Sequence, residues 1–183
     1  MGPSSPNTTG IDARSYWEQD RLLDGRSVLL RAIRPEDKGI LRAGFRRLSE
    51  RSIYQRFFHA KRELSEEELR YLTELDFENH VALLAVLEEH GSESTVGVGR
   101  YIVEPGTPSA EIAFVVDETH HGLGVATLLL RHLSKIARSK GVERFRAFVL
   151  FDNRAMVEVF EHSGLPIKKH LAGNVLEITL ELN

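Results

Sequence analysis

Two glycines lie where a short loop leads into a long helix. Gly122 and Gly124 follow an apolar strand that ends near Val116, and the next residues have helical apolar spacing up to about Lys140. Small residues let the backbone approach a ligand closely, and the first N–H groups of a helix have no intrahelical partner. With the positive end of the helix dipole, such a place binds phosphates without a basic side chain. Residues 121–127 are therefore a candidate pyrophosphate site, with a plain loop-to-helix turn as the alternative.

Two other phosphate-binding motifs fit this segment less well. A P-loop needs Gly-Lys-Ser/Thr at the start of the helix, and none is present. A dinucleotide-binding fold needs a third glycine where Thr127 stands, although Asp152 after the next strand imitates the acid that binds ribose. The hairpin strands before the motif argue against the parallel β-α-β units of that fold. An NAD-type oxidoreductase therefore ranks last among the alternatives.

The composition excludes several other kinds of chemistry. The chain has 183 residues and no cysteine, which excludes disulfides, thiolate metal sites and a cysteine nucleophile. The neighbouring His120 and His121 lack the spacing of a His-Glu-x-x-His metal site, and no Gly-x-Ser-x-Gly elbow of a serine hydrolase occurs. We therefore expect no metal.

The charges of the chain are nearly balanced. Lys plus Arg number 24 and Asp plus Glu 27, so the net charge of −3 gives no global basic field for nucleic acid or an anionic membrane. We interpret a local group of arginines as a solvated helix face: Arg42, Arg46, Arg47, Arg51 and Arg56. No apolar run approaches a membrane span, and the polar N-terminus does not resemble a secretory signal, so the expected location is cytoplasmic.

The order of elements predicts an α+β fold. Residues 1–24 are expected to form a flexible N-terminal segment with a possible short helix within 14–23, and residues 25–183 one domain. Apolar runs between turn signals predict about seven strands, at residues 27–33, 81–87, 95–103, 110–116, 142–150, 165–170 and 175–180. Helical spacing and caps predict helices at residues 35–48, 50–58, 65–75, 122–140 and 153–162. Such an order builds a mixed, mostly antiparallel sheet flanked by helices.

Two segments of the chain resemble a known superfamily. His121-Gly122-Leu123-Gly124-Val125-Ala126 resembles the acetyl-CoA motif Gln/Arg-x-x-Gly-x-Gly/Ala of the GNAT N-acetyltransferases. Asp152-Asn153-Arg154-Ala155-Met156, with Gly164-Leu165 further on, resembles the second CoA motif, and the element order matches over residues 25–183. Glu50–Phe58 and Val142–Phe145 resemble the catalytic domain of bacterial Pat-type protein lysine acetyltransferases.

The resemblance implies a GNAT fold and direct transfer of acetyl from acetyl-CoA to an amine. It implies that the cofactor contacts Phe114, Val115, Val116, His121, Gly122, Leu123, Gly124, Val125, Ala126, Thr127, Asn153 and Met156. In that comparison, backbone N–H groups around Phe114–Val116 face the thioester carbonyl. Asn153 then contacts the pantetheine arm or a water near the sulfur, and it is equally suited to cap the helix that follows it.

The resemblance also assigns a general base. An ammonium group near pKa 10.4 must lose a proton before it attacks a thioester, and a carboxylate can take that proton. Glu111 begins the strand that leads into the glycine loop, and in Pat-type enzymes the resembling glutamate is the base. On the residues alone, Glu111 would be interpreted as a surface residue at the end of a strand.

The acceptor implied by the Pat-type resemblance is a protein lysine, for example in an acyl-CoA synthetase. Tyr54, Arg56 and Phe58 are candidate acceptor-site residues, because the first helices cover that side in the family. The alternatives are a small amine or amino acid as acceptor, and a CoA-binding interaction module without catalysis. Two departures support the module: His121 stands where Gln or Arg is usual, and Phe160 where many members carry a tyrosine that protonates the leaving thiolate.

Overall fold

One mixed sheet organises the protein. The computed structural model describes residues 10–183, and in them eight strands follow the order β1-β2-β3-β4-β5-β6-β8-β7. The strands are β1 Trp17–Arg21, β2 Ser27–Ala32, β3 His80–Glu89, β4 Ser92–Val103, β5 Ser109–Val116, β6 Arg144–Leu150, β7 Ile167–Ala172 and β8 Val175–Glu181. All neighbours pair antiparallel except β5 and β6, which pair parallel. The predicted mixed, mostly antiparallel sheet is confirmed, with one strand more than expected.

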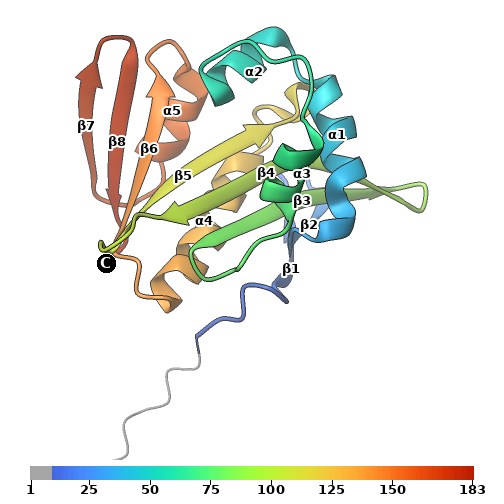
Figure 1. Cartoon of the computed structure of the whole chain (residues 1–183), viewed down its shortest axis with the longest axis horizontal. Helices are drawn as coiled ribbons and strands as arrows, with labels where there is room; N and C mark the ends of the chain where they lie inside the picture. The colour runs from blue at the N-terminus through green and yellow to red at the C-terminus, as the bar shows by residue number, and fades with distance from the viewer. Residues whose placement is uncertain (1–9) are drawn as a thin grey trace, which may run out of the picture.

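Five α-helices of the described residues cover the two faces of this sheet (Figure 1). They are α1 Lys38–Arg47, α2 Glu50–Phe57, α3 Glu66–Thr73, α4 Val125–Ser139 and α5 Arg154–Glu161. Helices α1, α2 and α3 lie on one face, and α4 packs on the other face against β3, β4 and β5. The predicted capping box is present at α3, where Ser65 Oγ accepts from the Glu68 N–H and the Glu68 carboxylate accepts from the Ser65 N–H.

The additional strand is β1, which replaces the short helix expected within residues 14–23. The turn at Asp24-Gly25 joins β1 to β2, and the register pairs Trp17 with Arg31. Asp20 Oδ2 on β1 also accepts a hydrogen bond from His132 Nε2 of α4 at 3.0 Å. Pairing with β2 and the contact with α4 therefore override the polar local sequence. Residues 1–9 of the expected flexible segment lie outside the described residues.

Two predicted boundaries were also wrong. The loop expected at residues 88–94 is a two-residue turn, His90-Gly91, and both residues have positive φ angles, 53° and 76°. This backbone matches the twist of the flanking strands, so the pairing of β3 and β4 continues up to the turn. The helix expected from Gly122 begins at Val125, because Gly124 adopts the left-handed conformation at its N-cap.

Helix α4 lies close to the sheet because β4 presents glycines beneath it. A Cβ atom at Gly97 would lie 2.6 Å from Val125 Cγ1, and one at Gly99 would lie 2.9 Å from Leu133 Cδ1. A larger residue at either position would force these side chains, or the helix that carries them, to move. The two glycines therefore help to fix the height of the helix N-terminus above the sheet.

The sheet opens between β5 and β6. These strands pair at three positions, Ser109 with Arg144, Ala110 with Phe145 and Glu111 with Arg146, and no pairing between them is present beyond Glu111. Residues 112–116 pair with β4 alone on their other side. The two strands therefore diverge from Glu111 onward, and their facing backbone groups become available to a ligand.

Candidate active site

A cleft of about 370 Å³ lies where β5 and β6 diverge. Its walls come from β5, from the loop and first turn of α4, from β6, from α5 and from α2. The predicted residues in its lining are Arg56, Phe58, Glu111, Phe114, Val115, Val116, His121, Gly122, Gly124, Val125, Ala126, Thr127, Asn153 and Met156. The volume falls in the range of ligand pockets. The fold thus brings segments that are far apart in the sequence together around one cleft.

Two predicted residues do not line the cleft. Tyr54 on α2 is 46% exposed and outside it. Leu123 is also outside, and its carbonyl instead accepts a hydrogen bond from the Leu23 N–H at 3.0 Å. Sequence reasoning missed Leu23, which follows β1, is 80% exposed and lines the cleft beside Gly124. An apolar residue next to the Asp24-Gly25 turn was the only signal for it.

The N-terminus of α4 has the properties of a pyrophosphate cradle. Gly122 and Gly124 have φ angles of 74° and 85°, and no side chain caps the helix. The N–H groups of Val125, Ala126 and Thr127 therefore have no intrahelical partner. They lie at the end of this 15-residue helix that borders the cleft. A Cβ atom at Gly122 would have no other atom within 4 Å, so the space beside this residue is open. These features fit the phosphates of acetyl-CoA.

His121 is held by the backbone of β5. Its Nε2 lies 3.0 Å from the Val116 carbonyl oxygen, so this nitrogen donates to the protein. His120 Nδ1 lies 2.9 Å from Thr119 Oγ1. The two histidines thus point to different partners, and His121 has only its second ring nitrogen left for a ligand.

The far wall of the cleft is formed by α5. Asn153 Oδ1 accepts from the Met156 N–H at 3.3 Å, so the N-cap function of Asn153 is confirmed. Phe160 is buried, and its ring centroid lies 5.9 Å from that of Phe114. An aromatic pair without a hydroxyl therefore forms this wall of the cleft.

Glu111 lies at the fork of the two strands and is exposed. The pleat places it on the same face as Ala113 and Val115, the face that α1 and α2 cover. Among the described residues its carboxylate has no ion pair or hydrogen bond, and the neighbouring Arg146 pairs with Glu104 and Glu177 instead. The carboxylate is therefore free to accept a proton from a ligand.

Asp117 anchors the loop between β5 and the glycines. Its carboxylate accepts from Arg47 Nε at 2.9 Å and from Thr119 Oγ1 at 2.7 Å. Burial opposes ionisation of Asp117, but these hydrogen bonds outweigh it and lower its pKa from 3.8 to about 2. The loop that leads into α4 is thus tied to α1.

The free energy of unfolding should depend on Asp117 in a defined pH window. Because its pKa is lower in the folded state, the ionised Asp117 stabilises the fold by about 1–2 kcal/mol above pH 4, and this stabilisation is lost as the pH falls from 3.8 to about 2. The free energies of unfolding of Asp117→Asn and of wild type, measured in urea, should differ near neutral pH and become equal near pH 2. A difference that does not change with pH would contradict this account.

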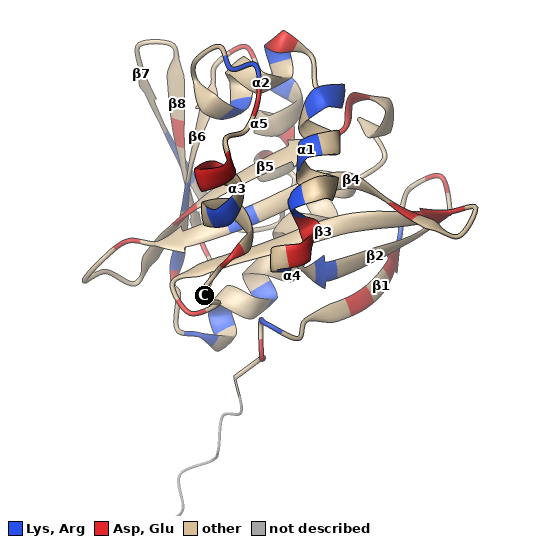
Figure 2. Ribbon diagram, turned by 45° about the vertical axis from the view of Figure 1, so that its right-hand side comes forward, with Lys and Arg blue, Asp and Glu red and all other residues tan. Residues whose placement is uncertain are grey.

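The charged surface shows no continuous basic field. In Figure 2, Lys and Arg on α1 alternate with Asp and Glu of neighbouring elements, and Arg42 pairs with Glu66 and Arg47 with Asp117. Over residues 10–183, no group of three or more His, Cys, Asp or Glu side chains is placed to hold a metal ion. None of the helices described has the length and apolarity to cross a membrane.

The chain belongs to the acetyltransferase (GNAT) family, whose sequence profile matches residues 49–165. Membership of this family makes the protein a GNAT acetyltransferase, a class of enzymes that uses acetyl-CoA. The fold, the fork between β5 and β6 and the cradle at α4 all agree with that assignment.

Three relatives are similar over most of this chain. An acetyltransferase of Pseudomonas aeruginosa, PA5475, is 33% identical over 77% of this chain and 75% of its own length. The acetyltransferase Pat of Mycolicibacterium smegmatis is 30% identical over 76% of this chain and 41% of its own length, so the chain spans less than half of that relative. The GNAT domain of S. lividans PAT superposes with a TM-score of 0.82 at 30% identity, over 90% of this chain and 96% of that domain.

Proposed function

We propose that this acetyltransferase acetylates the ε-amine of lysine in protein substrates, such as an acyl-CoA synthetase, in the cytoplasm. The observation that carries the proposal is Glu111, a carboxylate free of internal partners, at the fork of the cleft and facing the helices α1 and α2. The similarity to the two Pat proteins supports a protein lysine as the acceptor.

In the proposed reaction, bound acetyl-CoA supplies the thioester whose acetyl group passes to the amine. Glu111 takes the proton of the incoming ammonium, directly or through water, so that a neutral amine attacks. Backbone N–H groups of Phe114–Val116 that face β6 donate hydrogen bonds to the carbonyl oxygen as its negative charge grows. The α4 cradle holds the pyrophosphate and thereby fixes the position of the thioester.

The departing thiolate has no tyrosine to protonate it in this proposal. Phe160 occupies the wall of the cleft, and its packing against Phe114 keeps that place apolar. The attacking nitrogen loses its second proton to solvent in the cleft, and solvent supplies the proton of the thiolate. A thiol is acidic enough that its thiolate is a competent leaving group near neutral pH.

A panel of purified acyl-CoA synthetases incubated with acetyl-CoA tests the proposal. Free thiol and acetyl-lysine are followed together, and both should rise in step with at least one synthetase. A panel without acetyl-lysine, alongside turnover of a small amine, would replace the protein acceptor by a small one. Tight binding of acetyl-CoA without transfer to any amine would favour the non-catalytic CoA-binding module.

A further inference from the structure

Two arginines on the acceptor side of the sheet lack an acidic partner. Arg100 on β4 is 6% exposed, and within residues 10–183 no carboxylate lies at ion-pair distance from Arg100 or from Arg56 on α2. Arg31 is as deeply buried, yet it pairs with both Asp37 and Glu93 at 2.9 Å. The fold therefore pairs the buried Arg31 with two acids, and it leaves the buried Arg100 and the partly exposed Arg56 without an ion pair.

The contacts of Arg100 are neutral. Its Nη1 donates to His80 Nε2 at 3.0 Å and its Nη2 donates to the Leu72 carbonyl at 3.4 Å. Burial, with a further contribution from Arg100, lowers the pKa of His80 to about 4, so His80 is a neutral acceptor at pH 7. Neither contact offsets the positive charge of the guanidinium.

Arg56 shares the environment of Arg100. Its guanidinium lies over the ring of Phe57, with Cζ 5.1 Å from the centroid, and makes no hydrogen bond within the described part of the chain. Burial lowers the pKa of Arg56, against the opposing charge of Glu111, and burial together with Arg56 lowers that of Arg100 to about 9. Arg100 is buried and Arg56 is partly exposed, and the positive charge of Arg56 acts on Arg100, so an anion close to both groups would be stabilised.

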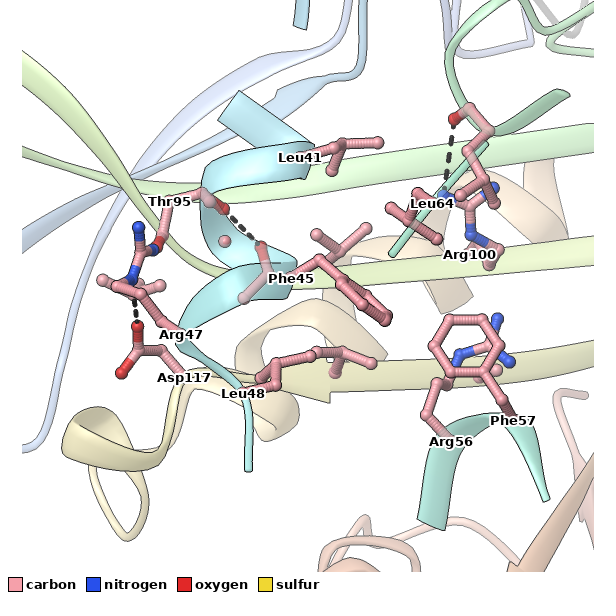
Figure 3. Close-up of a pocket in the computed structure, with 17 residues that line it drawn as sticks. Leu41, Phe45, Arg47, Leu48, Arg56, Phe57, Leu64, Thr95, Arg100 and Asp117 are labelled. Carbon is pink, nitrogen blue, oxygen red and sulfur yellow. Dashed lines mark hydrogen bonds and ion pairs between the residues drawn. The ribbon is translucent and has the colours of Figure 1, made fainter. Parts of the chain in front are cut away.

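A cavity next to the cleft of Glu111 is lined by both arginines. Both line a cavity of about 80 Å³ beneath α1, whose other walls are mostly apolar, Leu41, Phe45 and Leu48 among them (Figure 3). Figure 3 also shows both guanidinium groups at the same end of this cavity. Arg56 lines the cleft of Glu111 as well. An anion at the arginines would therefore lie beside the acceptor amine.

We propose that Arg56 and Arg100 bind the side-chain carboxylate of an acidic residue adjacent to the acceptor lysine. The inference rests on the proposed transfer to a protein lysine. The carboxylate accepts hydrogen bonds from the free N–H groups of both guanidinium groups, and its neighbouring lysine amine lies at Glu111. Substrate proteins are thereby selected by a Lys with Asp or Glu next to it, because a neutral residue leaves the two charges unpaired.

Paired lysine peptides test the selection. The two peptides differ only in Glu or Gln next to the lysine, and wild type should acetylate the Glu peptide with kcat/KM about tenfold or more above that of the Gln peptide. In Arg56→Gln this preference should disappear. The exposed Arg51→Gln on the same helix is the matched control and should keep the preference. Equal rates for both peptides in wild type would overturn the proposal.

A binding measurement separates this site from catalysis. Butyrate, which imitates a glutamate side chain, should bind wild type in ligand-observed NMR, and neutral butyramide should not. Binding should be lost in Arg56→Gln, and in Arg100→Met if that buried variant folds. Butyrate binding without any peptide acetylation would keep the anion site but refute the protein acceptor. If a free amino acid is acetylated in preference to both peptides, the proposed role of the acidic residue next to the lysine is wrong. If the peptides are acetylated but butyrate does not bind, the anion site is wrong and the protein acceptor stands.

Discussion

Replacement of Glu111 by glutamine is expected to lower kcat/KM about 100-fold to 10,000-fold, the usual contribution of a general base. The amide has the same shape but cannot take the proton of an ammonium group. Since Glu111 is exposed and unpaired within the described residues, the free energy of unfolding should stay within about 0.5 kcal/mol of wild type. The rate of thiol release from acetyl-CoA, measured against acceptor concentration, gives kcat and KM.

The pH profile distinguishes a base from a merely structural glutamate. As the pH approaches the amine pKa of about 10.4, solvent supplies the neutral amine and the deficit of Glu111→Gln should shrink. Glu143→Gln, an exposed acid ahead of β6 without an ion pair in the described structure, is the control and should behave as wild type. A Glu111→Gln enzyme with full kcat/KM would show that another group removes the proton.

Gly124→Ala is expected to weaken acetyl-CoA binding about tenfold, which corresponds to about 1.4 kcal/mol. The residue has φ of 85°, a conformation that costs an L-residue about 1–2 kcal/mol. The new Cβ atom would lie 3.4 Å from Leu23 Cγ, beside the free N–H groups at the start of α4. Any relaxation of the loop therefore moves the cradle. The Kd for acetyl-CoA from calorimetry checks this result, with Tm falling by about 2–4 °C.

Gly106→Ala is a matched control for that experiment. Gly106 also has a positive φ, 73°, and a Cβ there would meet nothing within 4 Å. It lies in the turn between β4 and β5, outside the residues that line the cleft. Its Tm should fall by a similar amount and its Kd for acetyl-CoA should not change. If Gly124→Ala kept the wild-type Kd, the loop would not be the pyrophosphate site.

The parts of the site that local sequence dictates were predictable. Gly122 and Gly124 need positive φ angles, and the N-cap of Asn153 follows from its side chain and position, so both could be inferred without coordinates. The fold class followed from the order of hairpins and helices, together with the resemblance to GNAT enzymes.

The parts that depend on tertiary contacts were not predictable. Strand β1 is polar and is fixed by its pairing with β2 and by polar contacts with α4. Leu23 reaches the cleft because that hairpin carries it to Leu123, and Tyr54 is outside because α2 presents another face. A charge within the apolar pattern of β4 was a usable signal for Arg100. Its lack of an acidic partner depends on side chains from other elements and could not be deduced from sequence.

The short parallel pairing of β5 and β6 has a mechanical consequence for the ligand-free enzyme. The sheet is continuous at that point through only three residue pairs, with β1–β5 on one side and β6, β8 and β7 on the other. Acetyl-CoA bound in the cleft, as proposed, would contact β5 and α4 on one side and α5 on the other, and it would thereby cross-link two halves of the protein. Binding of acetyl-CoA should therefore make the unfolding of the two halves more cooperative, since separation of β5 from β6 then requires release of the ligand.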